Sequence, residues 1–524
     1  MELHRGGEGG ASGSLRRSVF AWLRRFKAQQ EHSPGLRRAA GIAFLGAAVA
    51  AFVSPTPAQT PQHRFPSILT YASLNGIAPP ESGGEWNFEA THLDMAHGSA
   101  TDLQEIKKRN PAVFMVKYRL LETALVGTEE RELEAFCRSR SLPVEDAYLH
   151  YSDDTQMKVP KRSYLVKGWG SGTASKRSES RMRTAIWGSE RLVYNPGSPC
   201  VHQFMIARSL QDLSESHGGF HYDGIFIDEI GPPDWVSESG APPPVLSGGR
   251  IAEYSNHTRE EVSSAGLYLR DLVGLVNDIS LALKSASGGH SLFYLNTASY
   301  NTAAIMQLGL AGDGLLTEGL SSEGASYSPR GEALLWDNAK KLASAEKIYV
   351  FTQANPNPPK GNFDSGNYPS PADRHEMYSL ASYWMAKQGD STYYSLRYRW
   401  QQVSSFWVKA QEYDIGEPRG DYYLWKENTS TGDSLHQKYR IYRRDYTKAV
   451  ILFRTRYDWN EANNKDMSAK SETYDLRGTY RVLYSSGSLG PPVSQIALSL
   501  GEGVVLIPAS AAGTATRSGL PELE

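Results

Sequence analysis

The stretch His221-Tyr-Asp-Gly-Ile-Phe-Ile-Asp-Glu-Ile230 decides the fold of this chain. Its centre, Ile225–Ile227, is continuously apolar, as in parallel strands that are buried on both faces. Side chains alternate along a strand, so Gly224, Phe226 and Asp228 share one face. Asp228 therefore emerges at the carboxyl end of the strand, which is the end of a (β/α)8 barrel that carries catalytic groups. The stretch predicts a buried barrel strand that presents a functional carboxylate.

Residues 60–400 alternate between strand-like and helix-like segments. Further strands are expected at residues 67–72, 91–94, 112–118, 291–296, 314–318, 347–353 and 392–395, with 147–150 as a strand extension or a loop excursion. Helical periodicity lies at 129–138, 201–214, 264–285, 331–345 and 371–387. Such alternation predicts βαβ units around a parallel sheet. The number of units favours a closed (β/α)8 barrel over an open doubly wound sheet. No Gly-x-Gly-x-x-Gly motif opens a helix, so a dinucleotide site loses its main support.

A second pattern begins after residue 400. Residues 439–445 and 449–454 read as a hairpin, residues 480–484 as a strand, and residues 495–508 as a hairpin that turns at Gly501-Glu-Gly503. Short β segments at this spacing predict a small antiparallel β-sandwich over residues 401–510. The last residues, 511–524, are rich in Ala, Ser and Gly, and we expect a disordered tail there.

The first 58 residues are not expected to belong to the fold. A polar region with several arginines precedes the apolar run 39–53, and the small-residue exit Ser54-Pro-Thr-Pro-Ala-Gln59 follows it. This order is typical of a bacterial secretory signal. At 15 residues the run is shorter than the roughly 20 that span a membrane, although an uncleaved anchor through residues 39–53 stays open. The body of the protein is therefore expected to be secreted, periplasmic or attached to the cell envelope.

Composition narrows the classes of partner. The net charge is −2, and no long basic stripe lies beyond the N-terminus, so nucleic acid is not an expected partner. Aromatic residues make up 11% of the chain, a load that suits stacking on sugar rings as well as ordinary packing. The two cysteines, Cys137 and Cys200, could pair after export, but their spacing does not decide it, and two separate buried thiols are slightly favoured.

Two carboxylates stand out because each ends an expected barrel strand. Asp228 is one, and Glu318 in Asp313-Gly-Leu-Leu-Thr-Glu-Gly319 is the other. Hydrolysis of a glycosidic bond needs two carboxyl groups, one to donate a proton and one to attack the sugar or activate water. We predict Asp228 as nucleophile or general base and Glu318 as the acid, with Glu229 as the main competitor for either role. No cofactor is implied.

Other polar and aromatic residues at strand ends or in the loops after them are candidates for substrate binding: Asp94, Lys117, Trp187, Glu229, Trp235, Asn296, Tyr300 and Gln353. Asp94 with His92 and His97 invites a metal interpretation, but three ligands without an evident fourth are weak evidence, and we predict no metal site. Asp223 sits at the amino end of its strand, where barrel residues serve stability, and is interpreted as structural.

Several further segments form a recognisable set: residues 194–199, 222–228, 316–319 and 376–384, and in the β domain Asp414-Ile-Gly-Glu-Pro418 and Tyr442-Arg-Arg-Asp-Tyr446. At these residues the chain resembles the family known as hypothetical glycosyl hydrolase family 15 and, more distantly, barrels of the endo-polygalactosaminidase type. The resemblance covers roughly residues 65–510. These families often have Asp-Pro where this chain has Asn195-Pro196. The resemblance implies a barrel glycoside hydrolase. It implies a catalytic role most directly for Asp228.

The sequence thus predicts an exported glycoside hydrolase that cleaves a polysaccharide, such as a bacterial exopolysaccharide or wall glycan. The alternative is a non-catalytic polysaccharide-binding or envelope-assembly protein on a degenerate barrel. A deacetylase would need a histidine-rich metal site, and a lyase would need a charge-neutralising group, for which Lys117 is a thin candidate. No Gly-x-Ser-x-Gly elbow supports a serine esterase.

Overall fold

The computed structural model describes residues 68–74, 83–152, 155–159, 162–166, 176–186, 189–228, 230, 252–254, 266–296, 303–318, 329–353, 365–396, 402–428, 439–455 and 471–511. The predicted signal or anchor, residues 39–53, and the tail 512–524 lie outside this part of the chain. No helix in it is long and apolar enough to cross a membrane.

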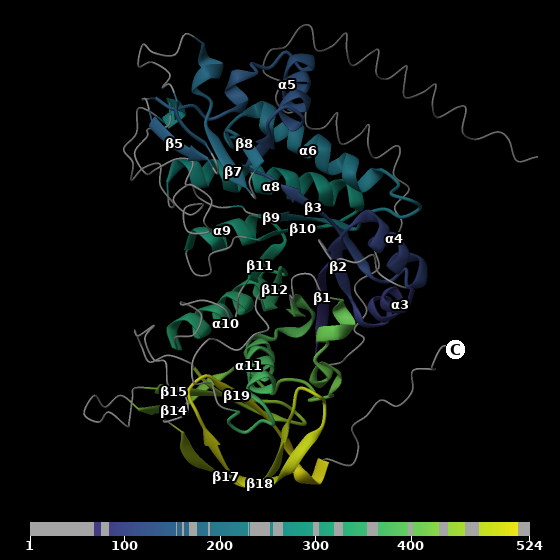
Figure 1. The fold of residues 1–524 in the computed structure, drawn as a ribbon, viewed down its shortest axis with the longest axis vertical. Coiled ribbons are helices and arrows are strands. Elements are labelled where there is room, and N and C mark those ends of the chain that lie inside the picture. Colours follow the sequence, from purple (N-terminus) through teal and green to yellow (C-terminus); the bar gives the residue numbers. More distant parts are fainter. Residues whose placement is uncertain are drawn as a thin grey trace, which may run out of the picture.

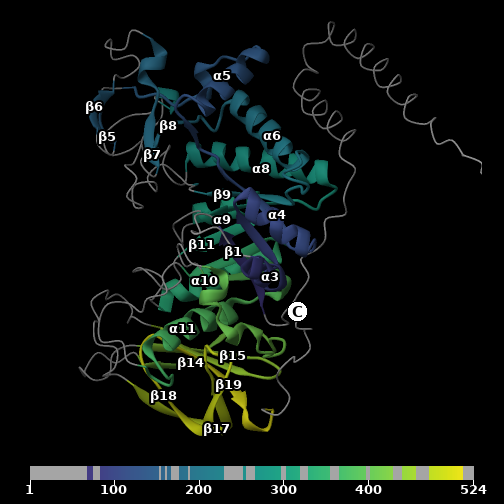
Figure 2. The same ribbon diagram turned by 45° about the vertical axis from the view of Figure 1, so that its right-hand side comes forward.

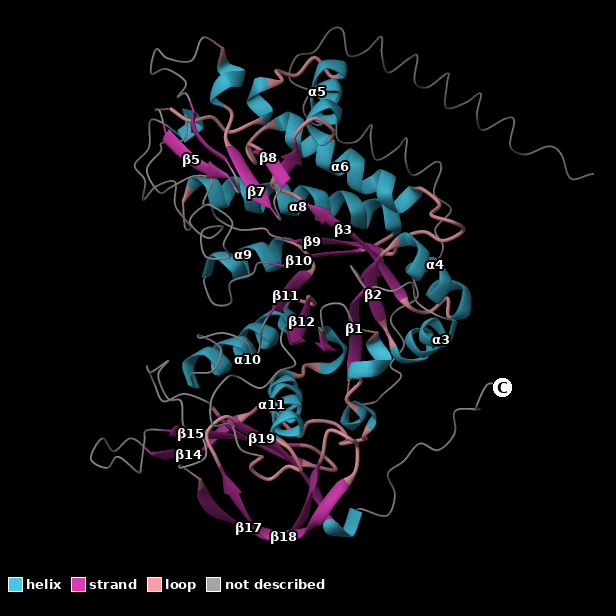
Figure 3. Ribbon diagram, in the orientation of Figure 1, coloured by secondary structure: helices cyan, strands magenta, loops and turns pink. Residues whose placement is uncertain are grey.

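Eight parallel strands close into a barrel at the middle of the molecule (Figure 1). In spatial order they are β1 (Leu69–Leu74), β13 (Thr392–Leu396), β12 (Ile348–Gln353), β11 (Gly314–Glu318), β10 (Leu292–Asn296), β9 (Gly224–Asp228), β3 (Phe114–Leu120) and β2 (Met95–Gly98). Helices surround the strands (Figure 3): α3 (Gly83–His92), α4 (Ala100–Arg109), α5 (Glu129–Ser139), α6 (Pro199–Ser214), α8 (Leu267–Ser287), α9 (Ala303–Ala311), α10 (Pro329–Ser344) and α11 (Pro371–Ala386). The predicted (β/α)8 barrel is confirmed.

Strand β9 shows why the apolar pattern is continuous. Phe226 packs inside the barrel with Tyr294, Val116 and other inward side chains. Ile225 and Ile227 belong instead to the core between the strands and the helices. All five residues of β9 are buried, because both faces of the strand are covered.

The second strand differs from the prediction. Residues 91–94 were expected to form it, but α3 runs to His92 and β2 begins only at Met95. The buried residues of α3 include Glu85 and Glu89, so its sequence lacks the apolar stripe that identifies a helix. Asp94 therefore lies at the amino end of β2, away from the barrel mouth where it was placed.

Three aspartates join neighbouring strands at the amino end of the barrel. Asp94, Asp223 and Asp313 each stand directly before a strand, namely β2, β9 and β11. The backbone N–H of each donates to the carbonyl of the second residue of the adjacent strand, at Thr70 (3.1 Å), Met115 (2.7 Å) and Phe293 (2.6 Å). The N–H of that same residue donates back to the aspartate carboxylate, at 2.8 Å, 2.8 Å and 3.0 Å. Each ring of two hydrogen bonds fixes the register of one strand pair. Asp223 thus has the structural role that was predicted for it.

An insertion separates β3 from β9. It contains the sheet of β4 (Thr123–Leu125), β8 (Ser189–Val193) and β7 (Arg183–Ile186), and the hairpin of β5 (Thr155–Val159) and β6 (Arg162–Val166). Residues 147–150 lie in this excursion and form only isolated bridges. A disulfide between Cys137 of α5 and Cys200 of α6 holds the insertion to the barrel helices, with a Cα–Cα distance of 5.6 Å. The preference for separate thiols was wrong, because their proximity depends on how α5 packs on α6.

The C-terminal residues form a separate antiparallel β domain, at the opposite end of the molecule from the insertion (Figure 2). Its order is β14 (Tyr423–Asn428), β15 (Tyr439–Asp445), β16 (Val450–Arg454), β19 (Glu502–Pro508), β17 (Glu472–Leu483) and β18 (Leu489–Leu498). Strand β17 bends where its pairing shifts between Asp475 and Tyr480. Trp425 of β14 then meets Tyr474 of β17 at 5.4 Å between ring centroids, so the sheet curls over itself. This arrangement is consistent with the predicted sandwich.

Helix α11 lies between the barrel and the C-terminal domain. The guanidinium of Arg444 donates to the carbonyls of Trp384 (3.0 Å) and Met385 (2.8 Å), and the Tyr446 hydroxyl donates to Trp384 (2.6 Å). The last carbonyls of a helix have no intrahelical partner, so these two side chains cap α11. The segment Tyr442-Arg-Arg-Asp-Tyr446 is therefore a structural joint between the domains.

We expect Asp313→Ala to destabilise the protein strongly. Its buried carboxylate binds Lys284 (2.5 Å), Lys347 (3.2 Å) and the N–H of Phe293, and removal leaves all three without this partner. The expected loss in unfolding free energy is about 3 kcal/mol, measured by urea denaturation. The control Asp278→Ala removes an aspartate of α8 whose side chain is 44% exposed and contacts His202 at 2.8 Å, and it should cost less than about 1 kcal/mol. Equal losses in the two variants would contradict the structural role of the hydrogen bonds between Asp313 and Phe293.

Stability should also depend on Glu332 of α10. This side chain is fully buried and accepts hydrogen bonds from Ser382 (2.8 Å) and Tyr378 (3.0 Å) of α11. Burial raises the pKa of Glu332 to about 8, against the partial opposing effect of these two donors. The unfolded chain ionises this carboxyl near pH 4.5, so its stabilising contribution falls as the pH rises from about 4.5 to about 8.

Replacement Glu332→Gln should remove this pH dependence, because an amide does not ionise. The variant should unfold at a higher temperature than the wild type at pH 8 and at a similar temperature near pH 4.5. Thermal unfolding followed by circular dichroism at both pH values measures the difference. A variant that is equally destabilised at both values would show that Glu332 is ionised in the folded protein.

Candidate active site

Asp228 lies at the carboxyl end of β9 with its carboxylate held by two neighbouring strands. Its exposed fraction is 7%. The hydroxyl of Tyr118, from β3, donates to Oδ2 at 2.7 Å. The side-chain amide of Asn296, from β10, donates to Oδ1 at 2.7 Å. Both carboxylate oxygens therefore have a fixed partner, which orients the group.

Asp228 thus has a hydroxyl and an amide as hydrogen-bond partners, and both groups can donate to a carboxylate. The role of Asp228 as nucleophile or general base stays a prediction.

An aromatic layer lies beneath Asp228 and forms the floor of the barrel mouth. It consists of inward-facing rings from five strands: Tyr71, His97, Tyr118, Phe226 and Tyr294. Phe226 is at its centre, with ring centroids 4.7 Å from His97, 5.0 Å from Tyr294 and 5.9 Å from Tyr118. These rings fill the barrel, so the polar groups at the strand ends stand on a rigid base.

The sequence patterns did not point to Tyr118, Tyr71 or Ser73, and His97 was considered only as a weak metal ligand. A signal was present for Tyr118: it follows Val116 by two positions in β3, so it shares the inner face. Its contact with Asp228 could not be found from sequence, because the insertion separates β3 from β9 along the chain and the two strands become neighbours only in the folded barrel.

Glu318 is the last residue of β11, and its backbone is in register with Thr352 of β12. Gln353 is the last residue of β12. The side chains of both lie outside the described part of the structure, as do Trp187, Glu229, Trp235 and Tyr300. Their predicted roles stay predictions.

Two buried hydroxyls stand beside the position of Glu318. Thr352 and Ser395 are in register on β12 and β13, each two residues after an inward-facing side chain. Both are 1% exposed, and within the described structure neither side-chain oxygen has a hydrogen-bond partner. They add hydrogen-bonding capacity to the inner wall at this end of the barrel.

Lys117 does not point toward the mouth. It alternates with the inward-facing Val116 and Tyr118, and its ammonium lies 5.1 Å from the ring centroid of Tyr222. Burial lowers the pKa of Lys117, and the positive charge of Arg119 lowers it further. The predicted position of Lys117 at the mouth was wrong, because Val116 and Tyr118 occupy the inward positions of β3 and Lys117 lies between them. Asp94, at the amino end of β2, is likewise remote from the mouth.

Glu253, in the short 3-10 helix Ala252–Tyr254, binds residues of the insertion. Its carboxylate accepts from the backbone N–H of His150 (2.9 Å), contacts His150 Nδ1 (2.5 Å) and meets Arg177 (3.3 Å). Glu145 contacts the other ring nitrogen of His150 at 3.2 Å. Burial lowers the pKa of His150, but the hydrogen bonds to Glu145 and Glu253 outweigh it, and the net pKa is raised. His150 thus bridges the carboxylates of Glu145 and Glu253.

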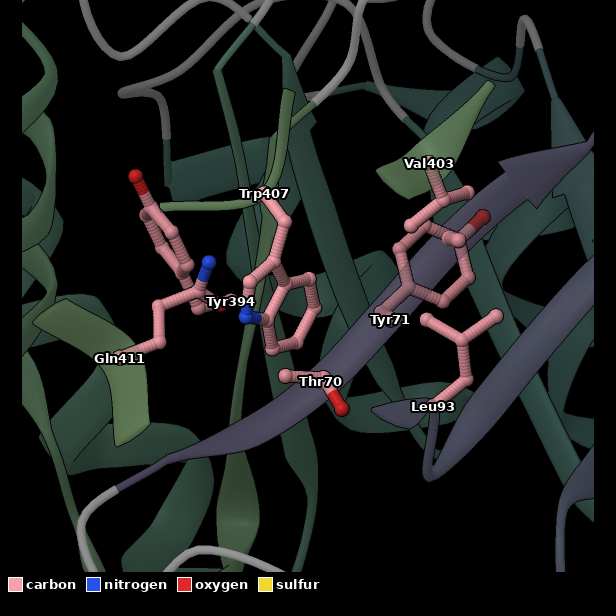
Figure 4. A pocket seen from close by; sticks show the side chains of 8 residues that line it. Thr70, Tyr71, Leu93, Tyr394, Val403, Trp407 and Gln411 are labelled. Atoms are coloured by element: carbon pink, nitrogen blue, oxygen red, sulfur yellow. The ribbon is translucent and has the colours of Figure 1, made fainter. Parts of the chain in front are cut away.

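A small pocket lies beside β1, lined by Thr70, Tyr71, Ala72, Leu93, Tyr394, Val403, Trp407 and Gln411 (Figure 4). It contains no carboxylate and none of the predicted site residues. We therefore place the candidate site at Asp228 and not in this pocket. In the part of the chain that the structure describes, no group of three His, Cys, Asp or Glu side chains is arranged to hold a metal ion.

Comparisons with known proteins give no family assignment. No family model matches the chain, so the resemblance noted from sequence stays a prediction. No curated protein matches it either.

Solved structures similar to the chain include glycoside hydrolases. The galactosidase domain of an alpha-galactosidase–sucrose kinase is 11% identical with a TM-score of 0.38, over 85% of this chain and 55% of that one. A cyclic alpha-maltosyl-(1→6)-maltose hydrolase from Arthrobacter globiformis is 10% identical with a TM-score of 0.36, over 87% and 100%. An alpha-galactosidase from Lactobacillus brevis is 11% identical with a TM-score of 0.38, over 92% and 59%. The chain thus spans little more than half the length of the alpha-galactosidase–sucrose kinase structure. The barrel assignment rests on the strand order and not on these values.

We expect Asn296→Asp to create a pair of carboxyl groups at the site. The amide nitrogen of Asn296 lies 2.7 Å from Asp228 Oδ1, so a second carboxylate there would repel the first and raise one pKa of the pair. The variant should match the wild type in stability near pH 4 and be less stable at pH 8, by about 1.4 kcal/mol for each unit of pKa change. Denaturant unfolding at the two pH values measures this. A loss that is the same at both would mean that Asn296 contributes only packing.

Proposed function

We propose that this protein is a glycoside hydrolase that cleaves a polysaccharide with a pair of carboxyl groups. The observation that carries the proposal is Asp228: a buried carboxylate at the catalytic end of a (β/α)8 barrel, with both oxygens held by donors from adjacent strands. A carboxylate so fixed is ready to attack an anomeric carbon or to take a proton from water. The aromatic layer beneath it keeps that geometry rigid.

Glu318 is the proposed acid. Its strand, β11, and the strand of Asp228, β9, flank β10 on either side, so the two residues end strands that are two positions apart in the barrel wall. Each ends its strand at the same edge of the barrel. In this proposal Asp228 is the nucleophile or general base, and Glu318 donates the proton to the leaving group. A carboxyl separation of about 5–5.5 Å gives retention of configuration, and about 6.5–9.5 Å gives inversion.

The substrate is proposed to be a bacterial exopolysaccharide or wall glycan. Support comes from the secretory character of residues 1–58 and from the sequence resemblance. The same features support action outside the cytoplasm, with the protein released or attached through residues 39–53. The disulfide between Cys137 and Cys200 agrees with an oxidising compartment.

Reducing-end release from a panel of bacterial and plant polysaccharides tests the proposal. We expect the wild type to release ends from at least one of them. Asp228→Asn and Glu318→Gln should each lower the rate at least about hundredfold, because each removes a group needed for the bond-breaking steps. The matched control is Asp223→Asn, at the amino end of the same strand, which should lower stability and leave kcat within about twofold of the wild type.

Circular dichroism must show that each variant is folded. Release that survives both Asp228→Asn and Glu318→Gln would contradict the assignment of the pair. Binding without release, unchanged in both variants, would instead support the alternative of a polysaccharide-binding protein on a degenerate barrel.

A further inference from the structure

His97 is a buried histidine at the barrel mouth that the two-carboxylate mechanism does not use. It lies on the inner face of β2 and is 3% exposed. Both ring nitrogens have partners on the adjacent strand β1: Ser73 Oγ lies 2.9 Å from Nε2, and the Tyr71 hydroxyl contacts Nδ1. A hydroxyl can donate or accept, so these two partners satisfy the neutral imidazole in either tautomer. The plane of the ring is therefore fixed from the β1 side.

The ring of His97 meets two side chains on its other sides. It stacks on Phe226 at 4.7 Å with an interplanar angle of 20°. It also contacts the ring of Tyr118, at 5.8 Å and 40°. The ring of Tyr118 in turn contacts the ring of Phe226, with 5.9 Å between the centroids. His97 and Phe226 thus form two walls of the space that the Tyr118 ring occupies.

Tyr118 links this packing to the candidate nucleophile. Its ring is held by His97 and Phe226, and its hydroxyl donates to Asp228 Oδ2 at 2.7 Å. A tyrosine hydroxyl stands at the end of a rigid ring, so a small rotation of that ring moves the donor away from Asp228. The direction of this hydrogen bond depends on the wall that His97 provides.

We propose that His97 is a positioning residue, which acts on Asp228 through Tyr118. Ser73 and Tyr71 set the plane of the imidazole, the imidazole sets the ring of Tyr118, and the Tyr118 hydroxyl orients the carboxylate. His97 itself contacts neither Asp228 nor, in this proposal, the substrate. The kinetic part of the proposal rests on the proposed glycosidase function, whereas the structural part does not.

A double-mutant cycle tests the kinetic part, with full-length protein and a polysaccharide that the wild type cleaves. Tyr118→Phe removes one hydrogen bond to a charged group, and we expect kcat to fall by about tenfold or more. His97→Asn should lower kcat by a similar factor. The double variant should be no slower than Tyr118→Phe alone, because both changes remove the same hydrogen bond. The control His202→Asn alters another histidine with both nitrogens bonded, in α6, and should leave kcat unchanged.

A second readout needs no activity. In protein labelled with carbon-13 at the tyrosine ζ position, the Tyr118 resonance is identified by its absence from Tyr118→Phe. It should shift when Asp228→Asn alters the acceptor, and shift again in His97→Asn, while His202→Asn leaves it in place. If His97→Asn does not fold, His97→Ala removes the same ring contact with Tyr118, and a shift in the same direction is expected.

The outcomes separate the two proposals. A shifted Tyr118 resonance in a protein that cleaves no polysaccharide would support the positioning role and overturn the glycosidase function. Cleavage by the wild type, with multiplicative losses in the double variant and an unmoved Tyr118 resonance, would overturn the positioning role alone.

Discussion

The barrel depends on how its parallel strands are joined at the amino end. Asp94, Asp223 and Asp313 each close a ring of two hydrogen bonds with the second residue of the neighbouring strand. The joined pairs are β1 with β2, β3 with β9, and β10 with β11, which are three of the four alternate pairs around the barrel. The fourth pair is β12 with β13, where the residue directly before β13 is Ser391 in place of an aspartate. A slip of one residue would turn every inward side chain outward, so these rings protect the whole interior.

This division of labour explains why one strand carries two aspartates with different tasks. Asp223 and Asp228 stand at opposite ends of β9. The first binds a backbone N–H and Lys107, and the second is held by side chains that leave it at the mouth. Because strand register is set at the amino end, the carboxyl end is free to carry polar groups that add nothing to closure.

Much of this could be predicted from sequence, for physical reasons that vary by element. The run before Asp228 identified a buried strand with Asp228 at its carboxyl end, because burial on both faces leaves a continuous apolar signal. Asp94 was misplaced because β2 begins four residues later than predicted, so Asp94 lies at its amino end. Lys117 was misplaced because it alternates with the inward-facing Val116 and Tyr118. The contact of Tyr118 with Asp228 and the disulfide were not found, because each joins segments that meet only in the folded chain. The inward position of Tyr118 could have been found from the alternation of side chains along β3.

The most direct test of the central claim is the product that Asp228→Ala forms in the presence of azide. If the carboxylate of Asp228 acts at the anomeric carbon, a small anion can enter the space that it leaves and attack in its place. The account predicts that azide restores part of the lost cleavage and that mass spectrometry finds a glycosyl azide. Cleavage by Asp228→Ala at the wild-type rate without azide would contradict it.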